Sequence, residues 1–181
     1  MAASLLGWRR KEEDMEPNES TYTEKSEWGP GPWQDEHDRI EWRDEATGLP
    51  CLIVRGGGGA LCGYVAVSPG HPYHGVNGFS GEPAEIEVHG GITFGSPCIE
   101  GGKICHVPQP GESDDVYWLG FDCGHYMDVR PMDAVVDRRY GFDRGPLGGG
   151  ATYKTVDYVR DEVTSLARQL ASVTAPESET P

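Results

Sequence analysis

The chain has 181 residues, 36% of them hydrophobic, which is enough for one domain with its own core. Its formal net charge of -15, from 30 acidic and 15 basic residues, disfavours direct binding to nucleic acid, because such a surface repels phosphates. The sequence contains no apolar run near the ~20 residues that a membrane helix needs, so no membrane partner is expected.

The two ends differ in composition from the middle of the chain. Residues 1–26 are polar and rich in glutamate, which predicts a disordered N-terminal arm. Residues 173–181 have the same character and predict a disordered tail. Between them, residues 27–172 are expected to form a single α+β domain.

Five cysteines, an odd number, occur without any Cys-x-x-Cys spacing. The apolar stretch at residues 2–8 is too short for the core of a secretory signal peptide, and charged residues follow it on the wrong side. The sequence therefore predicts free thiols in a reducing cytoplasm, several of them buried as small apolar side chains.

Three strands are expected in the first half of the domain. Residues 39–43 alternate polar with apolar side chains, which places Ile40 and Trp42 on one face of a strand. Apolar runs at residues 49–54 and 60–67 follow, each after a glycine-containing turn. Consecutive strands with tight turns predict an antiparallel meander.

Further strands are expected at residues 85–94, 104–107 and 116–121. The first alternates with period two, which puts His89 on its polar face. Residues 116–121 are apolar on both faces, so a central place in the sheet is predicted.

Two helices complete the prediction. Residues 131–137 begin with proline, which suits the first position of a short helix. In residues 152–171, apolar residues recur at spacings of three and four and form one stripe. The expected fold is α+β, an antiparallel β-meander packed by a C-terminal amphipathic helix.

Four residues that commonly bind metals or move protons lie in two short glycine-marked segments: His89, Asp122, His125 and Asp128. If these segments meet at one end of the sheet, His89, His125 and Asp128 are the predicted ligands of Zn²⁺ or another divalent ion. Asp122 is then predicted to orient a ligand or to act as a catalytic base. Without a metal, His125 beside a carboxylate is a candidate base.

Two alternatives stay open. Asp122 can cap a turn while the histidines serve ordinary surface roles. Cys98, Cys105 and His106 can contribute to a zinc site, although the tight knuckle spacing is missing and buried thiols are the preferred interpretation.

Six separated phrases of the sequence resemble an uncharacterised group of proteins from tailed phages, prophages and some bacteria. The resemblance covers residues 28–170 and rests on these segments: 26–33, 47–55, 60–67, 88–94, 104–108 and 120–125. It implies a phage or prophage setting and a cytoplasmic location, and it brings no activity and no catalytic residues.

Two functions are carried forward. The first is a metal-assisted hydrolase or a protein that binds a small molecule, built on the four residues above. The second is a non-catalytic, acidic phage accessory protein that binds or inhibits a host protein.

Overall fold

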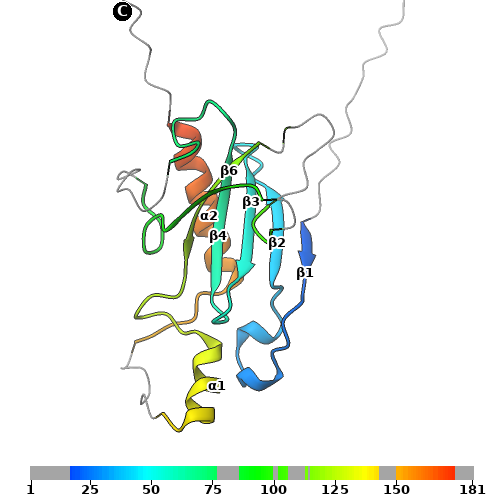
Figure 1. Ribbon diagram of the computed structural model, residues 1–181, viewed down its shortest axis with the longest axis vertical. Helices are drawn as coiled ribbons and strands as arrows, with labels where there is room; N and C mark the ends of the chain where they lie inside the picture. The colour runs from blue at the N-terminus through cyan, green and yellow to red at the C-terminus, as the bar shows by residue number, and fades with distance from the viewer. Residues whose placement is uncertain are drawn as a thin grey trace, which may run out of the picture.

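A single antiparallel sheet with one helix against its face dominates the computed structural model, which describes residues 17–76, 86–99, 102–105, 113, 115–142 and 150–173 (Figure 1). The strands are β1 (Asn18–Ser20), β2 (Arg39–Arg43), β3 (Pro50–Arg55), β4 (Leu61–Val67), β5 (Phe94–Pro97) and β6 (Tyr117–Asp122). Their order in the sheet is β1-β2-β3-β4-β6-β5. The helices are α1 (Pro131–Tyr140) and α2 (Val156–Ser172), and two 3-10 turns are η1 (Ser26–Trp28) and η2 (Pro32–Gln34). The predicted α+β fold is confirmed.

The predicted meander corresponds to β2, β3 and β4, which pair in sequence order. In the register, Trp42 lies opposite Cys51, and Ile53 lies opposite Gly63. Alternation in β2 buries Ile40 on the helix side of the sheet, as the sequence pattern predicts. Short turns between these strands make the antiparallel pairing the simplest arrangement.

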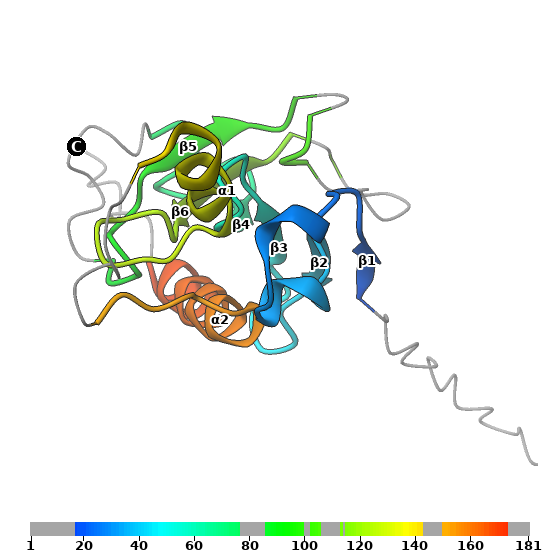
Figure 2. The ribbon, with the colours of Figure 1, turned by 90° about the horizontal axis from the view of Figure 1, so that it is seen from below.

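Helix α2 covers one face of the sheet, as the view from below shows (Figure 2). Its apolar stripe is completely buried and consists of Val159, Val163, Leu166, Ala167 and Leu170. Gly63 on β4 permits this close approach, because a Cβ there would lie 2.5 Å from Cγ2 of Val163. The predicted amphipathic helix and its packing on the sheet are therefore confirmed.

The helix begins four residues later than the sequence pattern suggests. Thr155 is the N-cap, and its hydroxyl accepts a hydrogen bond from the backbone N–H of Tyr158 at 3.3 Å. The backbone N–H of Val156 donates to Oε1 of Glu36 at 2.9 Å. The residues before the cap stay extended, and Thr152 forms a bridge with Asp128.

Helix α1 is three residues longer than predicted. Pro131 occupies its first turn, as expected, and Gly141 ends it with a left-handed backbone at φ 68°. The helix lies at one end of the sheet, beside η1, at the bottom of Figure 1.

The other face of the sheet carries a smaller apolar cluster around Trp118 and Leu52. Phe94, Cys98 and Ile104 pack against it from the segment that contains β5.

Cys98 and Cys105 form a disulfide, which corrects the prediction that all five thiols are free. Their Cα atoms lie 5.0 Å apart, whereas the sequence had placed Cys105 in a strand over residues 104–107 and preferred buried, unpaired thiols. The remaining thiols, Cys51, Cys62 and Cys123, are free, and burial raises the pKa of Cys51 to about 12. His106, the third member of the alternative zinc set, lies outside the described residues.

The predicted strand over residues 85–94 is wrong. Residues 86–93 are irregular, and β5 begins only at Phe94. Gly90 and Gly91 have φ angles of 69° and 82°, a left-handed conformation that lies outside the range of a regular strand. Of the strand predicted at 104–107, residues 104 and 105 are not in a strand, and the other two lie outside the described residues.

Strand β6 is interior to the sheet, between β4 and β5, one place from the edge. The predicted central place is therefore only approximately right. Both of its faces are apolar because each faces one of the two clusters, with Leu119 on the helix side and Trp118 on the other.

The ordered domain begins earlier than predicted. Strand β1 pairs with β2, and the nearby Lys25 side chain is 5% exposed and lies 2.9 Å from Oδ1 of Asp38. Residues 17–26 therefore belong to the domain, not to a disordered arm. The rest of the predicted arm, residues 1–16, and residues 174–181 of the predicted tail lie outside the described part of the chain.

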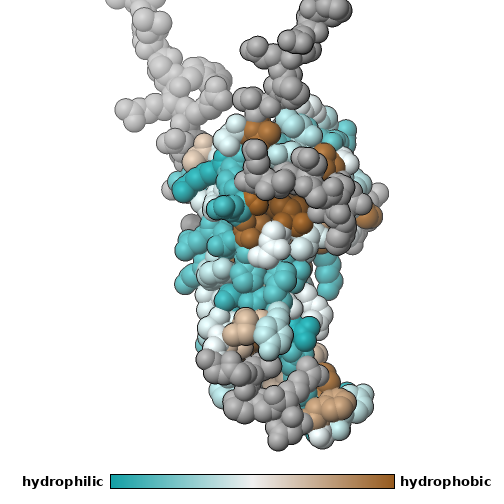
Figure 3. All heavy atoms as spheres, turned by 90° about the vertical axis from the view of Figure 1, so that its left-hand side faces the viewer, coloured by the Kyte–Doolittle hydropathy of each residue, from teal (hydrophilic) through white to brown (hydrophobic). Residues whose placement is uncertain are grey.

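The surface is mixed in character. Figure 3 shows one side of the molecule, on which apolar residues gather above a belt of hydrophilic ones. Large apolar side chains that are well exposed include Ile99, Tyr126 and Phe142. None of the described helices is both long enough and apolar enough to cross a membrane.

Candidate metal centre

Three of the four predicted site residues meet at one place. His125 and Asp128 lie in the loop that follows β6, and His89 lies in the irregular segment before β5. The imidazole centroids of His89 and His125 are 5.3 Å apart. One potential ligand atom from each of the three side chains lies within 4.8 Å of the other two. The condition set by the sequence, that the two segments converge, is fulfilled.

The loop between His125 and Asp128 is a tight turn with reciprocal hydrogen bonds. The Asp128 backbone N–H donates to the carbonyl of His125 at 2.9 Å, and the His125 backbone N–H donates to Oδ2 of Asp128 at 3.0 Å. Backbone hydrogen bonds to Thr152 on both sides of Asp128 tie this turn to the segment before α2. The spacing of three therefore places both side chains on the same side of the turn.

His89 is held by three contacts. Its backbone N–H donates to Oε2 of Glu162 at 2.8 Å. Its Nδ1 lies 3.0 Å from the Tyr158 hydroxyl, and its Nε2 lies 2.7 Å from Oδ2 of Asp128. Helix α2 thus orients the His89 imidazole towards the Asp128 carboxylate. The strand predicted for residues 85–94 did not include this contact with α2.

Gly90 packs directly on the ring of His125. A Cβ at this position would lie 2.0 Å from Cε1 and 2.4 Å from Nε2 of His125, so any side chain here would force the His125 ring to move. The left-handed backbone of Gly90 also favours glycine. The neighbouring glycine has the same kind of backbone but open space around it. Gly90 is therefore what lets the two imidazoles approach.

Asp128 is the buried member of the set, with a side chain 2% exposed, whereas His89 and His125 are 16% and 39% exposed. Burial by itself raises the pKa of Asp128. The hydrogen bonds from His89 and from the His125 N–H, with the nearby charges of His89 and Lys154, outweigh it and hold that pKa below its usual value. Asp128 is thus a charged carboxylate with one oxygen directed at the imidazoles.

Asp122, the fourth predicted residue, caps the turn after β6. Its Oδ1 accepts from the Gly124 backbone N–H at 2.8 Å, and its Oδ2 accepts from the Thr93 hydroxyl at 3.3 Å. It is not a member of the three-residue set. This is the turn-capping arrangement that the sequence left open as the alternative.

Three residues of the site were missed from the sequence: Lys154, Tyr158 and Glu162. Nζ of Lys154 lies 3.6 Å from Oδ1 of Asp128. Tyr158 and Glu162 are four apart on α2, off the buried stripe, so they share one side of the helix. That spacing was visible in the sequence, but nothing in it indicated that His89 would lie against that side.

The donor set suits a first-row divalent ion. Two imidazoles and one carboxylate are ligands of Zn²⁺ and related ions in sites that keep a position open for water or substrate. The partly exposed ring of His125 leaves the set reachable from solvent. To bind an ion, Nε2 of His89 would exchange its hydrogen bond with Asp128 for a bond to the metal.

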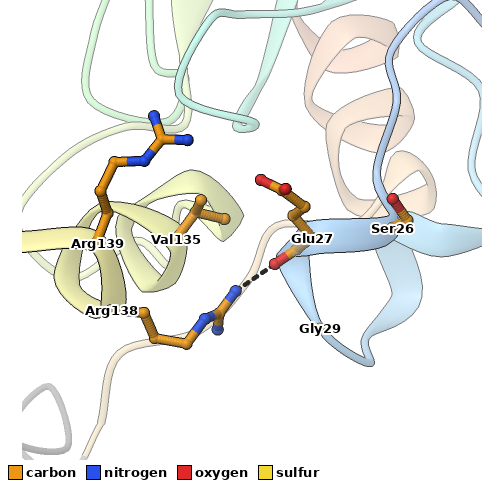
Figure 4. A pocket seen from close by; sticks show the side chains of 6 residues that line it. All are labelled: Ser26, Glu27, Gly29, Val135, Arg138 and Arg139. Atoms are coloured by element: carbon orange, nitrogen blue, oxygen red, sulfur yellow. Dashed lines mark hydrogen bonds between the residues drawn. The ribbon is translucent and has the colours of Figure 1, made fainter.

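A separate hollow of about 550 Å³ lies between α1 and η1 (Figure 4). Its lining includes Arg138, Arg139 and Glu27, and Arg138 donates a hydrogen bond to the backbone carbonyl of Glu27. The hollow carries charges of both signs and contains none of the predicted site residues. It therefore does not extend the metal centre.

No protein-family model matches the chain, and comparisons with curated proteins and with solved structures also find no significant match. The arguments about function therefore rest on the site itself.

Proposed function

We propose that the protein binds a divalent first-row metal ion, Zn²⁺ or a close relative, through His89, His125 and Asp128. The observation that carries the proposal is the convergence of three donor atoms within 4.8 Å from segments more than thirty residues apart. The buried carboxylate of Asp128 stays charged beside two imidazoles, and together they form a donor set that suits such an ion.

We further propose that the bound ion serves hydrolysis of a small molecule. Such an ion lowers the pKa of a bound water and makes it a nucleophile near neutral pH. The Tyr158 hydroxyl can accept a hydrogen bond from Nδ1–H of His89, which leaves Nε2 free as the ligand atom. Asp122 as the base stays a prediction, and its contacts with Gly124 and Thr93 favour a structural role instead.

Calorimetric titration of zinc into the full-length protein tests the proposal. We expect one ion per chain with a Kd of ~1 µM or tighter. Zinc at a hundredfold excess over Kd should stabilise the fold by about 2.7 kcal/mol and so raise Tm. His125→Ala should weaken binding at least tenfold, because it removes one of the three ligands. His125 is also the most exposed of the three, so its removal should disturb the fold least.

The matched control is His37→Ala. His37 is also an exposed histidine beside a carboxylate, with Nε2 3.0 Å from Oε2 of Glu19. Its removal should leave zinc affinity unchanged. Equal affinity in wild type and His125→Ala, or no zinc binding at all, would contradict the metal site.

A second candidate is a metal-independent base. The 2.7 Å contact between Nε2 of His89 and the buried carboxylate of Asp128 favours it, because a base held by a carboxylate has this geometry. The two candidates differ in their response to a chelator. Hydrolysis of p-nitrophenyl esters that survives a chelator supports the base, and hydrolysis restored only by zinc supports the metal.

The phage setting and the cytoplasmic location stay proposals, as does the second function as a binder of a host protein. The Cys98–Cys105 disulfide weighs against a reducing compartment, where such bonds are rare. Retention of a defined host protein by both the wild type and His125→Ala would favour the binder, since that role needs no metal.

A further inference from the structure

We infer that the metal centre takes a substrate with an anionic oxygen group, phosphoryl or carboxylate, and that Lys154 binds this group. The inference rests on the proposed metal site and deepens it by naming the substrate class. It starts from Lys154, a cation beside the ligand set that binds no metal itself.

Lys154 is placed with some precision. Its Nζ lies 3.6 Å from Oδ1 of Asp128, the carboxylate oxygen that faces away from His89. Thr152 accepts a hydrogen bond from the same ammonium, which also lies 5.3 Å from the ring centroid of Tyr158. The side chain is 19% exposed, so the ammonium is held in place and still reaches solvent.

A bound ion would change what Lys154 faces. In the metal-free protein the Asp128 carboxylate balances the ammonium. A divalent ion on Oδ2 would neutralise that carboxylate and add positive charge beside Lys154. Glu162, whose Oε2 accepts from the His89 backbone N–H, contributes one negative charge, which does not cancel the charges of the ion and of Lys154 together with Asp128. The loaded centre is therefore locally positive within a protein of net charge -15, and an anionic ligand would balance it.

The distances suit one bridging group. An oxygen ligand lies ~2.0–2.2 Å from zinc, and a charge-assisted hydrogen bond from an ammonium spans ~2.7–2.9 Å. One oxyanion can meet both when the ammonium lies 3.6 Å from a ligating carboxylate. Phosphoryl and carboxylate groups share this chemistry.

Three probes that differ only in their polar group test the inference: phenylphosphonate, benzoate and neutral benzamide. Each is titrated into the zinc-saturated protein by calorimetry. We expect one or both anions to bind and benzamide not to bind, and the preferred anion identifies the group. In Lys154→Met, anion affinity should fall about tenfold or more, because a charge-assisted hydrogen bond is lost.

Lys103→Met is the matched control, since Lys103 also lies over a tyrosine ring, 4.8 Å from the centroid of Tyr22. Lys103→Met should leave anion affinity unchanged, and Lys154→Arg should retain anion binding.

The zinc titration is performed first on every variant. Absence of zinc binding in the wild type would refute the metal site and this inference with it. Zinc binding with equal anion affinity in Lys154→Met, or with benzamide bound as well as the anions, would refute the inference alone. Loss of zinc in Lys154→Met would also overturn it, because Lys154 would then support Asp128.

Discussion

Two polar clusters lie on either side of the short segment that leads into α2. They differ in exposure, since one is buried and the other is partly open to solvent. Tyr153 reaches into a buried network of charges, while the next residue, Lys154, reaches the candidate metal centre. Consecutive side chains of an extended segment point in opposite directions, so one stretch of chain supports both clusters.

The buried network is closed and satisfied. Arg55 Nε donates to Oδ1 of Asp38 at 2.7 Å, and Lys25 Nζ lies 2.9 Å from the same oxygen. The Tyr153 hydroxyl accepts from Nη1 of Arg55 at 2.7 Å and donates to Oε2 of Glu36. The side chains of Lys25, Asp38 and Arg55 are no more than 5% exposed. These groups hold the N-terminal segment, β3 and the start of α2 together.

The candidate metal centre is open by comparison. Its carboxylate is nearly as buried as that of Asp38, but His125 is 39% exposed. Nδ1 of His125 lies 3.5 Å from Oδ2 of Asp128, too far for a strong hydrogen bond. A saturated, buried cluster has a structural role, whereas the exposed and loosely held His125 ring leaves this second cluster with capacity for a ligand.

The largest effect is expected from Asp38→Asn. It leaves Arg55 and Lys25 buried without the negative charge of Asp38, and breaking a buried ion pair costs ~3–5 kcal/mol. Urea denaturation should show this loss in the free energy of unfolding. Asp35→Asn, the same change at a nearby exposed acid, should stay within ~0.5 kcal/mol. Equal effects of the two substitutions would remove the distinction between the clusters.

A second prediction concerns acid. Burial raises the pKa of Asp38, but hydrogen bonds from Lys25, from the Tyr22 and Thr23 backbone N–H groups and from Arg55 hold it well below its usual range. Its stabilisation is therefore complete above the unfolded pKa of ~3.9 and is lost as pH falls below it, through the folded pKa. The loss should be on the order of 2 kcal/mol.

Urea denaturation of wild type and Asp38→Asn from pH 7 downwards measures this dependence. The stability difference between them should be constant above pH ~5 and shrink below pH ~4. A difference that stays constant to the lowest pH would show that Asp38 does not carry the acid sensitivity.

The smallest effect on stability is expected from Gly90→Ala, which should act mainly on zinc affinity. Its Cβ would collide with the His125 ring, so zinc affinity should fall ~10–100-fold, as when a support of a ligand is lost. Gly91→Ala is the control, because it has the same left-handed backbone and nothing within 4 Å of its Cβ.

Both substitutions carry a similar backbone cost of ~1–2 kcal/mol, which thermal denaturation would measure. Only Gly90→Ala should also lose zinc affinity in the calorimeter. A parallel loss in both variants would mean that backbone strain, not contact with His125, is responsible.

From the sequence alone, the local elements followed well. Alternation defined β2, and turn residues separated β3 and β4, because short antiparallel strands are specified by their own patterns. In α2 the apolar spacing predicted the buried Val159, Val163, Leu166 and Leu170, whereas Val156 of the same predicted stripe is only partly buried. The pairing of His125 with Asp128 also followed, since three residues of spacing within one turn leave few arrangements.

The tertiary structure decided what joins distant segments. The alternating pattern around His89 suggested a strand, but two left-handed glycines bend the chain there and direct the imidazole to Asp128. The Cys98–Cys105 disulfide was likewise invisible, because it depends on where the chain returns after β5.

Tyr158 and Lys154 show the same limit most clearly. Neither residue stands out in the sequence. Both become part of the site only because the segment around His89 lies against α2. Periodicity reports which side of an element is buried, but not which distant side chain will face the other side. The three residues of the candidate metal centre could therefore be predicted from the chain, whereas its supports and its geometry came only from packing.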